Sequence, residues 1–178
     1  MVRGHIFGVL TMLNMTKHLV RVAHLNVRTE FHGEDEVTMV DLTLIAEVAN
    51  FELDKLSPTL RESLFDGDPD MLGADENPLV HPKNPELGAL RWKAEFDLVV
   101  LRLHAGAKAK DDIVFGDAKI KKIGFEPEEG GTCKTVYQIA VQPTEDQGAR
   151  LMMLLGRDVR ISLEACEQPE ESGVENAE

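Results

Sequence analysis

Apolar and polar residues alternate along two runs near the start of the chain, and a glycine-containing turn separates the runs. The first run has its apolar residues mostly at odd positions: Leu19, Ala23, Leu25, Val27 and Phe31. The second has them at even positions: Val40, Leu42, Leu44, Ala46 and Val48. A period of two is typical of a strand with one buried face. With the turn at His32-Gly33-Glu34-Asp35, the pattern predicts an antiparallel hairpin.

A short helix and a long loop are predicted next. Leucines recur at helical spacing from Leu53 to Leu64, and Ser57-Pro58 is typical of a helix start, so we expect a helix over residues 58–65. Residues 66–88 contain four prolines, which oppose regular strand pairing. The sequence therefore predicts a loop over residues 66–88, and a connection of this length is usually functional or poorly ordered.

The second half of the chain again predicts strands and one helix. Residues 96–103 are apolar on both faces, as in a central strand that is covered on both sides. Short strands are expected at 113–115 and 118–125, followed by a Gly130-Gly131 turn and a strand over 132–142. Thr144 and Gln147 form a capping-box pattern, which predicts a helix that Gly156 ends. The last strand is expected over residues 157–165.

These elements predict an α+β fold, mainly antiparallel sheet, as a sandwich or partly open barrel with two short helices. The order strand, glycine turn, strand, helix occurs over residues 23–64 and again over 118–155, so a duplicated unit is one interpretation. We expect one domain over 15–165, a loose arm or annotation extension over 1–14, and an acidic disordered tail over 166–178. The residues predicted to be buried are Leu42, Leu44, Leu101, Ile139, Leu151 and Ile161.

Composition places the chain among soluble globular proteins. Its 178 residues are 43% hydrophobic and 29% charged, and no apolar run approaches the ~20 residues of a membrane-spanning helix. The two cysteines, Cys133 and Cys166, form neither a disulfide framework nor a metal-ligand pair. Free thiols are typical of a reducing compartment, so a cytoplasmic location is expected.

Motifs for catalysis, metals and cofactors are missing from the sequence. There is no phosphate-binding glycine loop and no HExxH. The acidic run Asp66–Asp70 starts like a calcium loop, but Met71 stands where that loop needs glycine and Asn77 where it needs glutamate. We therefore predict no metal, no cofactor and no enzyme activity. The sequence leaves undecided whether the fold brings His24, His104 and Asp41 together as a site.

Charge is distributed unevenly along the chain. The formal net charge is −13, and the five glutamates of residues 167–178 account for −5 of it. Residues 102–122 carry six basic residues against three aspartates, a local +3. A basic strand and loop is the pattern of phosphate contacts, although lysine on an edge strand also protects against aggregation. The candidate nucleic-acid-binding residues are Arg102, Lys108, Lys110, Lys119, Lys121 and Lys122. Most aromatic residues are expected in the core. Those that could instead form a stacking platform are Trp92, Phe96, Phe115, Phe125 and Tyr137.

Four segments carry a resemblance to known proteins: Val22–Glu34, Asp112–Thr132, Val141–Gln147 and Asp158–Leu163. In their general pattern they resemble small uncharacterised proteins encoded by tailed phages and prophages, over about residues 15–165. The resemblance implies a phage accessory role in the host cytoplasm and carries no site residue.

These observations favour a non-enzymatic accessory protein that binds single-stranded DNA in phage replication or recombination. A β-rich body with a basic patch and an acidic tail is similar to single-stranded-DNA-binding proteins, whose tails recruit partners, so residues 167–178 are the expected protein-docking segment. The low aromatic content of 5% weakens this prediction. One alternative is an acidic inhibitor or DNA mimic that acts on a host nucleic-acid enzyme or defence system, and another is a virion component. We expect no membrane partner, and the sequence leaves undecided whether the chain forms a homo-oligomer.

Overall fold

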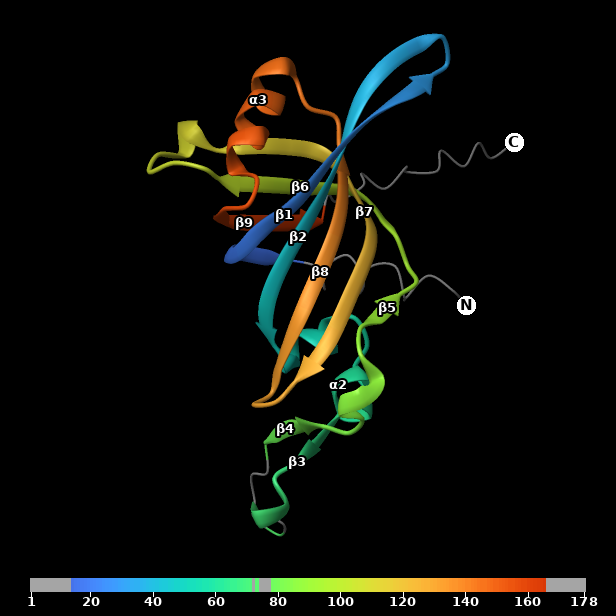
Figure 1. The fold of residues 1–178 in the computed structure, drawn as a ribbon, viewed down its shortest axis with the longest axis vertical. Helices are drawn as coiled ribbons and strands as arrows, with labels where there is room; N and C mark the ends of the chain where they lie inside the picture. The colour runs from blue at the N-terminus through green and yellow to red at the C-terminus, as the bar shows by residue number, and fades with distance from the viewer. Residues whose placement is uncertain (1–13, 72, 74–77, 166–178) are drawn as a thin grey trace, which may run out of the picture.

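The computed structural model describes residues 14–71, 73 and 78–165 (Figure 1). The first strands are β1 (Met15–His32), β2 (Asp35–Ala49), β3 (Phe65–Gly67), β4 (Leu79–Pro82) and β5 (Leu90–Trp92). The later ones are β6 (Phe96–His104), β7 (Ile113–Glu128), β8 (Thr132–Val141) and β9 (Asp158–Ala165). The α-helices are α2 (Leu60–Leu64) and α3 (Glu145–Leu154). The 3₁₀ turns are η1 (Asn50–Lys55), η2 (Pro69–Met71), η3 (Pro85–Leu87) and η4 (Ala109–Asp111).

Six antiparallel strands close into a barrel. The hydrogen-bonded order runs β7-β6-β9-β1-β2-β8, and β8 pairs with β7 to close the ring. Strands β6, β7 and β8 form a meander, and β9 returns beside β6, so these four strands make a Greek key. Closure leaves the barrel wall without an edge over most of its length. The fold is thus mainly antiparallel with few short helices, as predicted, and the barrel is closed rather than partly open.

The predicted buried face of β1 was wrong at the start of the strand, and after the bulge the predicted face is only partly covered. Val20 and Val22 face the core, whereas Leu19, Val27 and Phe31 are 51%, 59% and 71% exposed. A bulge between Val22 and His24 shifts the register of β1 against β2, which reverses the parity of the inward residues. The alternation in the sequence therefore does not follow one continuous face.

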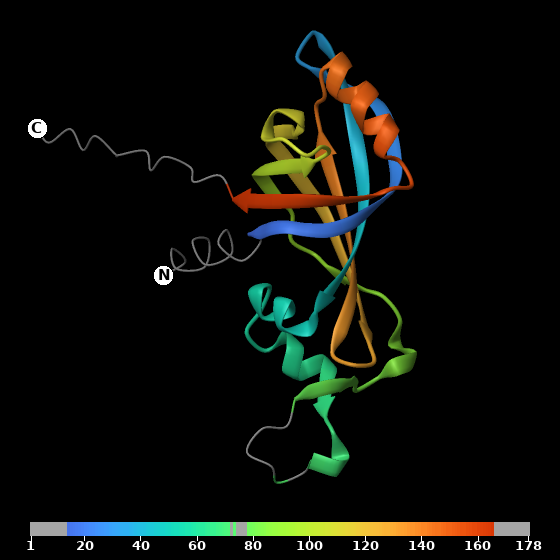
Figure 2. The same cartoon turned by 90° about the vertical axis from the view of Figure 1, so that its left-hand side faces the viewer.

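Two caps cover the ends of the barrel, as Figure 2 shows. At one end α3 lies across the opening and buries Leu151, and at the other η1 inserts Leu53. The capping box of α3 is confirmed, because Thr144 Oγ1 accepts from Gln147 N at 3.3 Å. Gly156 follows the helix with φ of 75°, as its predicted position requires.

The segment predicted as a 66–88 loop contains a small sheet of its own. Strands β3 and β4 pair antiparallel, with Phe65 opposite Pro82. Proline is tolerated there because a two-stranded ribbon has an outer edge that needs no donor. Positions 72 and 74–77 fall between these strands and lie outside the described residues.

Other differences from the expected elements are local. The predicted strands 113–115 and 118–125 are one continuous strand, β7. Strand β6 is covered on one face only, since Leu98 is 40% exposed. The helix predicted over 58–65 is shorter, and Thr59 rather than Ser57 precedes it.

The predicted core is confirmed at all six positions: Leu42, Leu44, Leu101, Ile139, Leu151 and Ile161 are each at most 1% exposed. Within the described ranges, no helix has the length and hydrophobicity needed to cross a bilayer. The predicted arm over 1–14, except Asn14, and the predicted tail over 166–178 lie outside the described residues.

Candidate functional site: a basic groove on the barrel wall

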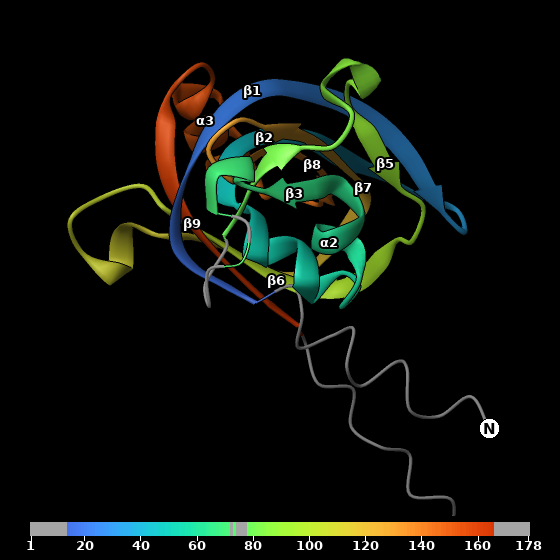
Figure 3. The ribbon, with the colours of Figure 1, turned by 90° about the horizontal axis from the view of Figure 1, so that it is seen from below.

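A groove with a cavity volume of about 430 Å³ lies on the outer face of the barrel. It lies where β1, β6 and β9 run side by side and where the segment around η4 projects from the wall (Figures 1 and 3). The residues that line it are Lys17, Arg102, His104, Gly106, Ala107, Lys108, Ala109, Asp112 and Arg160. Ligand pockets in proteins typically have volumes of this order.

Strand register brings the groove side chains together. Leu101, Leu103 and Ile161 face the core. Their sequence neighbours therefore face outward, and the pairing of β6 with β9 places Arg102 opposite Ser162 and His104 opposite Arg160. Lys17 joins them from β1.

The β1 backbone is irregular where it meets the groove. The register of β1 against β9 shifts between Met15 and His18. Lys17, which lies inside this shift, has φ of 46°, a conformation that is uncommon for a residue with a side chain. Its backbone is held on both sides, because Lys17 N donates to Ser162 Oγ at 3.0 Å and Arg160 Nη1 donates to Lys17 O at 3.0 Å.

A chain of hydrogen bonds forms the floor of the groove. The Ser162 hydroxyl and His104 Nε2 are 2.8 Å apart, and His104 Nδ1 lies 3.2 Å from Asp112 Oδ2. Arg102 Nη1 approaches the same carboxylate oxygen at 3.4 Å. His104 thus joins Ser162 and Asp112 through its two ring nitrogens.

This serine–histidine–aspartate order is that of a hydrolase triad, but the hydroxyl is not placed for attack. Ser162 is 7% exposed and does not line the groove. Its oxygen also accepts the Lys17 N–H, so its lone pairs face the protein. A nucleophile needs free access to the substrate's reacting atom. The three residues therefore hold the β1, β6 and β9 backbones and the η4 segment in place.

Positive charge is concentrated in the groove. Its lining has four permanent cations, Lys17, Arg102, Lys108 and Arg160, against the carboxylate of Asp112, which gives +4 − 1 = +3. The whole chain carries −13, so this region is opposite in sign to the rest of the molecule. In the described part of the chain, neither Lys17 nor Lys108 has a carboxylate within 4.0 Å. A concave surface with unpaired cations attracts anions.

The structure divides the six predicted nucleic-acid-binding residues into two groups. Arg102 and Lys108 line the groove, and Lys110 lies in η4 beside it. Lys119, Lys121 and Lys122 belong to β7, elsewhere on the barrel.

Two of the β7 lysines are engaged by carboxylates. Lys119 Nζ lies 2.9 Å from Glu95 and 3.4 Å from Asp97, and these groups raise the pKa of Lys119. Lys121 Nζ lies 3.6 Å from Asp41. Their charge is therefore partly neutralised within the protein.

The aromatic side chains considered for stacking lie mainly in the core, as the alternative interpretation of the sequence predicted. Phe96, Phe115, Phe125 and Tyr137 are buried in the barrel, each at most 8% exposed, and Trp92 is half-buried on β5. Alternation on β6, β7 and β8 turns the four buried rings inward. Among the described residues, those lining the groove include no phenylalanine, tyrosine or tryptophan.

The fold does not group His24, His104 and Asp41 as one site, because His104 lies on β6 whereas His24 and Asp41 lie on the paired strands β1 and β2. His24 is exposed on β1 opposite Thr43, and Asp41 lies opposite Asn26 on the barrel wall. Asp41 accepts from Arg28 Nε at 2.9 Å. Within the described ranges, no three His, Cys, Asp or Glu side chains are grouped as a metal site.

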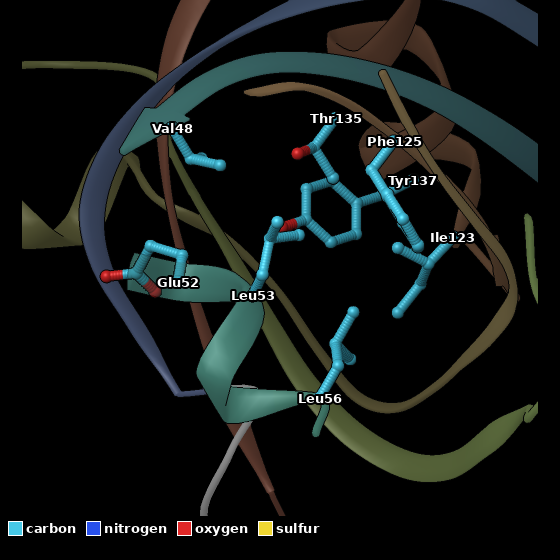
Figure 4. Close-up of a pocket in the computed structure, with 8 residues that line it drawn as sticks. All are labelled: Val48, Glu52, Leu53, Leu56, Ile123, Phe125, Thr135 and Tyr137. Carbon is cyan, nitrogen blue, oxygen red and sulfur yellow. The ribbon is translucent and has the colours of Figure 1, made fainter. Parts of the chain in front are cut away.

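A second, much smaller cavity of about 30 Å³ lies at the barrel end under η1 (Figure 4). Its walls are apolar except for Glu52, Thr135 and Tyr137. Burial raises the pKa of the Tyr137 phenol, and burial raises the pKa of the nearby Cys133 thiol to about 12. Both groups stay protonated at neutral pH, and Cys133 is buried in the core. The cavity has room for little more than a water molecule.

The sequence prediction missed Lys17 and Arg160. Each is a single basic residue in a strand, and only the pairing of β6, β9 and β1 places them beside Arg102. One signal was present: basic side chains occur at outward positions near the ends of two predicted strands, at Arg102 and Arg160.

Comparison with known proteins gives no relative: no family model, no curated protein and no solved structure matches the chain. The site must therefore be interpreted from its own geometry.

Proposed function

We propose that this protein is a non-enzymatic binding protein that holds single-stranded nucleic acid through its backbone phosphates in the basic groove. The observation that carries the proposal is the convergence of Lys17, Arg102, Lys108 and Arg160 around one cavity on an otherwise acidic protein. Arginine and lysine are the side chains that bind phosphate oxygens most often in nucleic-acid complexes.

The lining of the groove favours phosphates over bases as the contacted groups. Without stacking rings in the groove, binding gains nothing from base planes. Its affinity then depends on charge neutralisation, which is independent of sequence and falls steeply with salt. The fixed positions of Arg102, held by Asp112, and Arg160, held by the Lys17 carbonyl, favour a defined path for the bound strand.

A second function is favoured by the charge of the rest of the surface. The tip of the β1–β2 hairpin exposes Glu34, Asp35 and Glu36, and the chain as a whole is strongly acidic. This distribution supports an inhibitor or DNA mimic that presents carboxylates to a basic protein. In that case the groove has no role in nucleic-acid binding.

A salt titration of binding distinguishes the two. The fluorescence anisotropy of a labelled oligothymidine is measured with the wild-type protein at low and moderate salt, with a duplex of equal length alongside. We expect saturable binding at low salt, with a log–log salt slope of about −0.7 for each phosphate contacted. Absence of binding at low salt, where screening is weakest, would reject the proposal and support the acidic-surface function.

A further inference from the structure

The outer edge of the β1–β2 hairpin is unpaired where it extends past the end of the barrel (Figures 1 and 2). Strand β9 pairs with β1 only from Met15 to Arg21, while β2 pairs with β1 up to His32. Among the described residues, no backbone hydrogen bond joins residues 23–32 to any strand other than β2. An open strand edge is a template for another strand.

The turn fixes which backbone groups face this edge. Gly33, with φ of 70°, begins a two-residue turn that His32 and Asp35 flank. Such a turn is closed by a hydrogen-bonded pair, and hydrogen-bonded and non-hydrogen-bonded pairs then alternate along the ladder. From this alternation, the N–H and C=O groups of Leu25, Val27, Thr29 and Phe31 point to the open edge.

The same stretch exposes apolar side chains. Val27 is 59% exposed and Phe31 is 71% exposed, among the highest fractions for large apolar residues in the described chain. Both lie on the face that continues from the barrel interior, because Val27 is opposite the buried Val40. An edge strand that combines free backbone groups with exposed apolar residues is typical of an interaction site.

We propose that this edge binds the same edge of a second copy of the chain, so that two β1 strands pair antiparallel about a twofold axis at Thr29. This register places Arg28, which also contacts Glu30 and Asp41 of its own chain, opposite Glu30 of the second copy. It places Val27 opposite Phe31 of the second copy. The charged pairs and the apolar pairs are thus each formed twice, as an isologous interface requires.

Charge complementarity selects this register over its neighbours. Moving the axis to Arg28 places two arginines opposite each other, and moving it to Glu30 does the same with two glutamates. Like charges directly opposite one another destabilise a sheet. The register centred on Thr29 also pairs odd residues with odd residues, so that the outward-facing backbone groups of the two strands meet.

Proline substitution tests the interface with a matched control. Thr29→Pro removes an N–H that faces the open edge, and Thr38→Pro removes the N–H of its cross-strand partner, which faces the opposite edge. By sedimentation velocity over a range of concentrations, we expect the wild-type protein and Thr38→Pro to dimerise. Thr29→Pro should raise the dissociation constant about tenfold or more, since each dimer then lacks two hydrogen bonds. A monomeric wild-type protein, or equal effects of the two substitutions, would overturn the proposal.

A cysteine cross-link tests the register without depending on the fold of the proline variants. In a Cys166→Ser background, with Cys133 buried, Thr29→Cys places two thiols in a directly opposed hydrogen-bonded pair. The Cα separation of such a pair, about 5.5 Å, fits disulfide geometry. We expect a covalent dimer from Thr29→Cys and a monomer from Thr38→Cys under the same oxidation. The reverse result, or no dimer from Thr29→Cys, would contradict the register.

Discussion

Asp41 shows how a carboxylate is kept ionised on the barrel wall although it is only 5% exposed. Burial alone would raise its pKa, but the hydrogen bond from Arg28 and the Lys121 ammonium outweigh burial and hold the pKa of Asp41 below its usual value. The arrangement joins β1, β2 and β7 through one side chain. It also explains why Lys121, an expected phosphate ligand, is engaged within the protein.

The depressed pKa of Asp41 predicts a pH-dependent stability. A carboxyl whose pKa is lower in the folded state stabilises the fold above its unfolded value of about 3.9, and this contribution is lost as the pH falls through the folded value. We expect Asp41→Asn to cost about 1–3 kcal/mol at neutral pH and progressively less in acid. Urea unfolding of both proteins between about pH 2 and pH 7 measures this. A constant difference across that range would contradict the ionised state of Asp41.

Ser162 supports the groove through two hydrogen bonds, to the Lys17 backbone and to His104. Replacing it with alanine leaves both the Lys17 N–H and His104 Nε2 without this hydrogen-bond partner. We expect Ser162→Ala to lower the unfolding free energy by about 1–3 kcal/mol, while the exposed Ser63→Ala has little effect. Chemical denaturation of the two variants is the measurement. If Ser162→Ala left the unfolding free energy unchanged, the hydrogen-bond chain would not hold the strands.

At the scale of elements, sequence patterns predicted strands best where one face stays buried along the whole strand. The face of β2 and the buried residues Ile139 on β8 and Ile161 on β9 were predicted correctly, and the capping box located α3. The assignment failed on β1, because a bulge changes the parity and no residue type marks it. It also failed on β3 and β4. The prolines there predicted a loop, but proline does not prevent pairing at the outer edge of a two-stranded ribbon.

A pair of substitutions tests the revised face of β1. Val22 is 0% exposed and Leu19 is 51% exposed, the reverse of the parity predicted from the sequence. We expect Val22→Ala to cost about 1–3 kcal/mol and Leu19→Ala to be near neutral, since only the first removes buried apolar surface. Thermal or urea unfolding gives both values. A larger loss of stability at Leu19 would restore the original assignment.

At the scale of the whole molecule, the site depends on residues that are distant in the sequence. Arg102 and Lys108 were predicted from the basic run, but Lys17 and Arg160 reach the groove only through the pairing of β1, β9 and β6. The sequence contains the charges but not their arrangement. The same limit explains why Lys119 and Lys121 were expected at the site, since their acidic partners are distant in the sequence or on another strand.

The acidic C-terminal segment provides a test of the electrostatic argument. Residues 167–178 carry −5 and lie outside the described residues. Removing them lowers the overall repulsion of nucleic acid, and removes a competing anion if they reach the groove. We expect their deletion to tighten oligothymidine binding at low salt, measured by anisotropy, and to have less effect at high salt. Unchanged affinity at low salt would contradict the electrostatic contribution of this segment.

The central claim is that the groove, and not the basic strand β7, binds phosphates. Two double variants that change the net charge equally test it, Arg102→Glu/Arg160→Glu in the groove and Lys119→Glu/Lys121→Glu on β7. Circular dichroism first establishes that each variant is folded, and oligothymidine affinity is then measured over a salt series. The account predicts that the groove variant binds far more weakly and that its log–log salt slope flattens by about 0.7 for each phosphate it no longer binds, while the β7 variant keeps the wild-type slope. Loss of binding in the β7 variant, with retention in the groove variant, would contradict it.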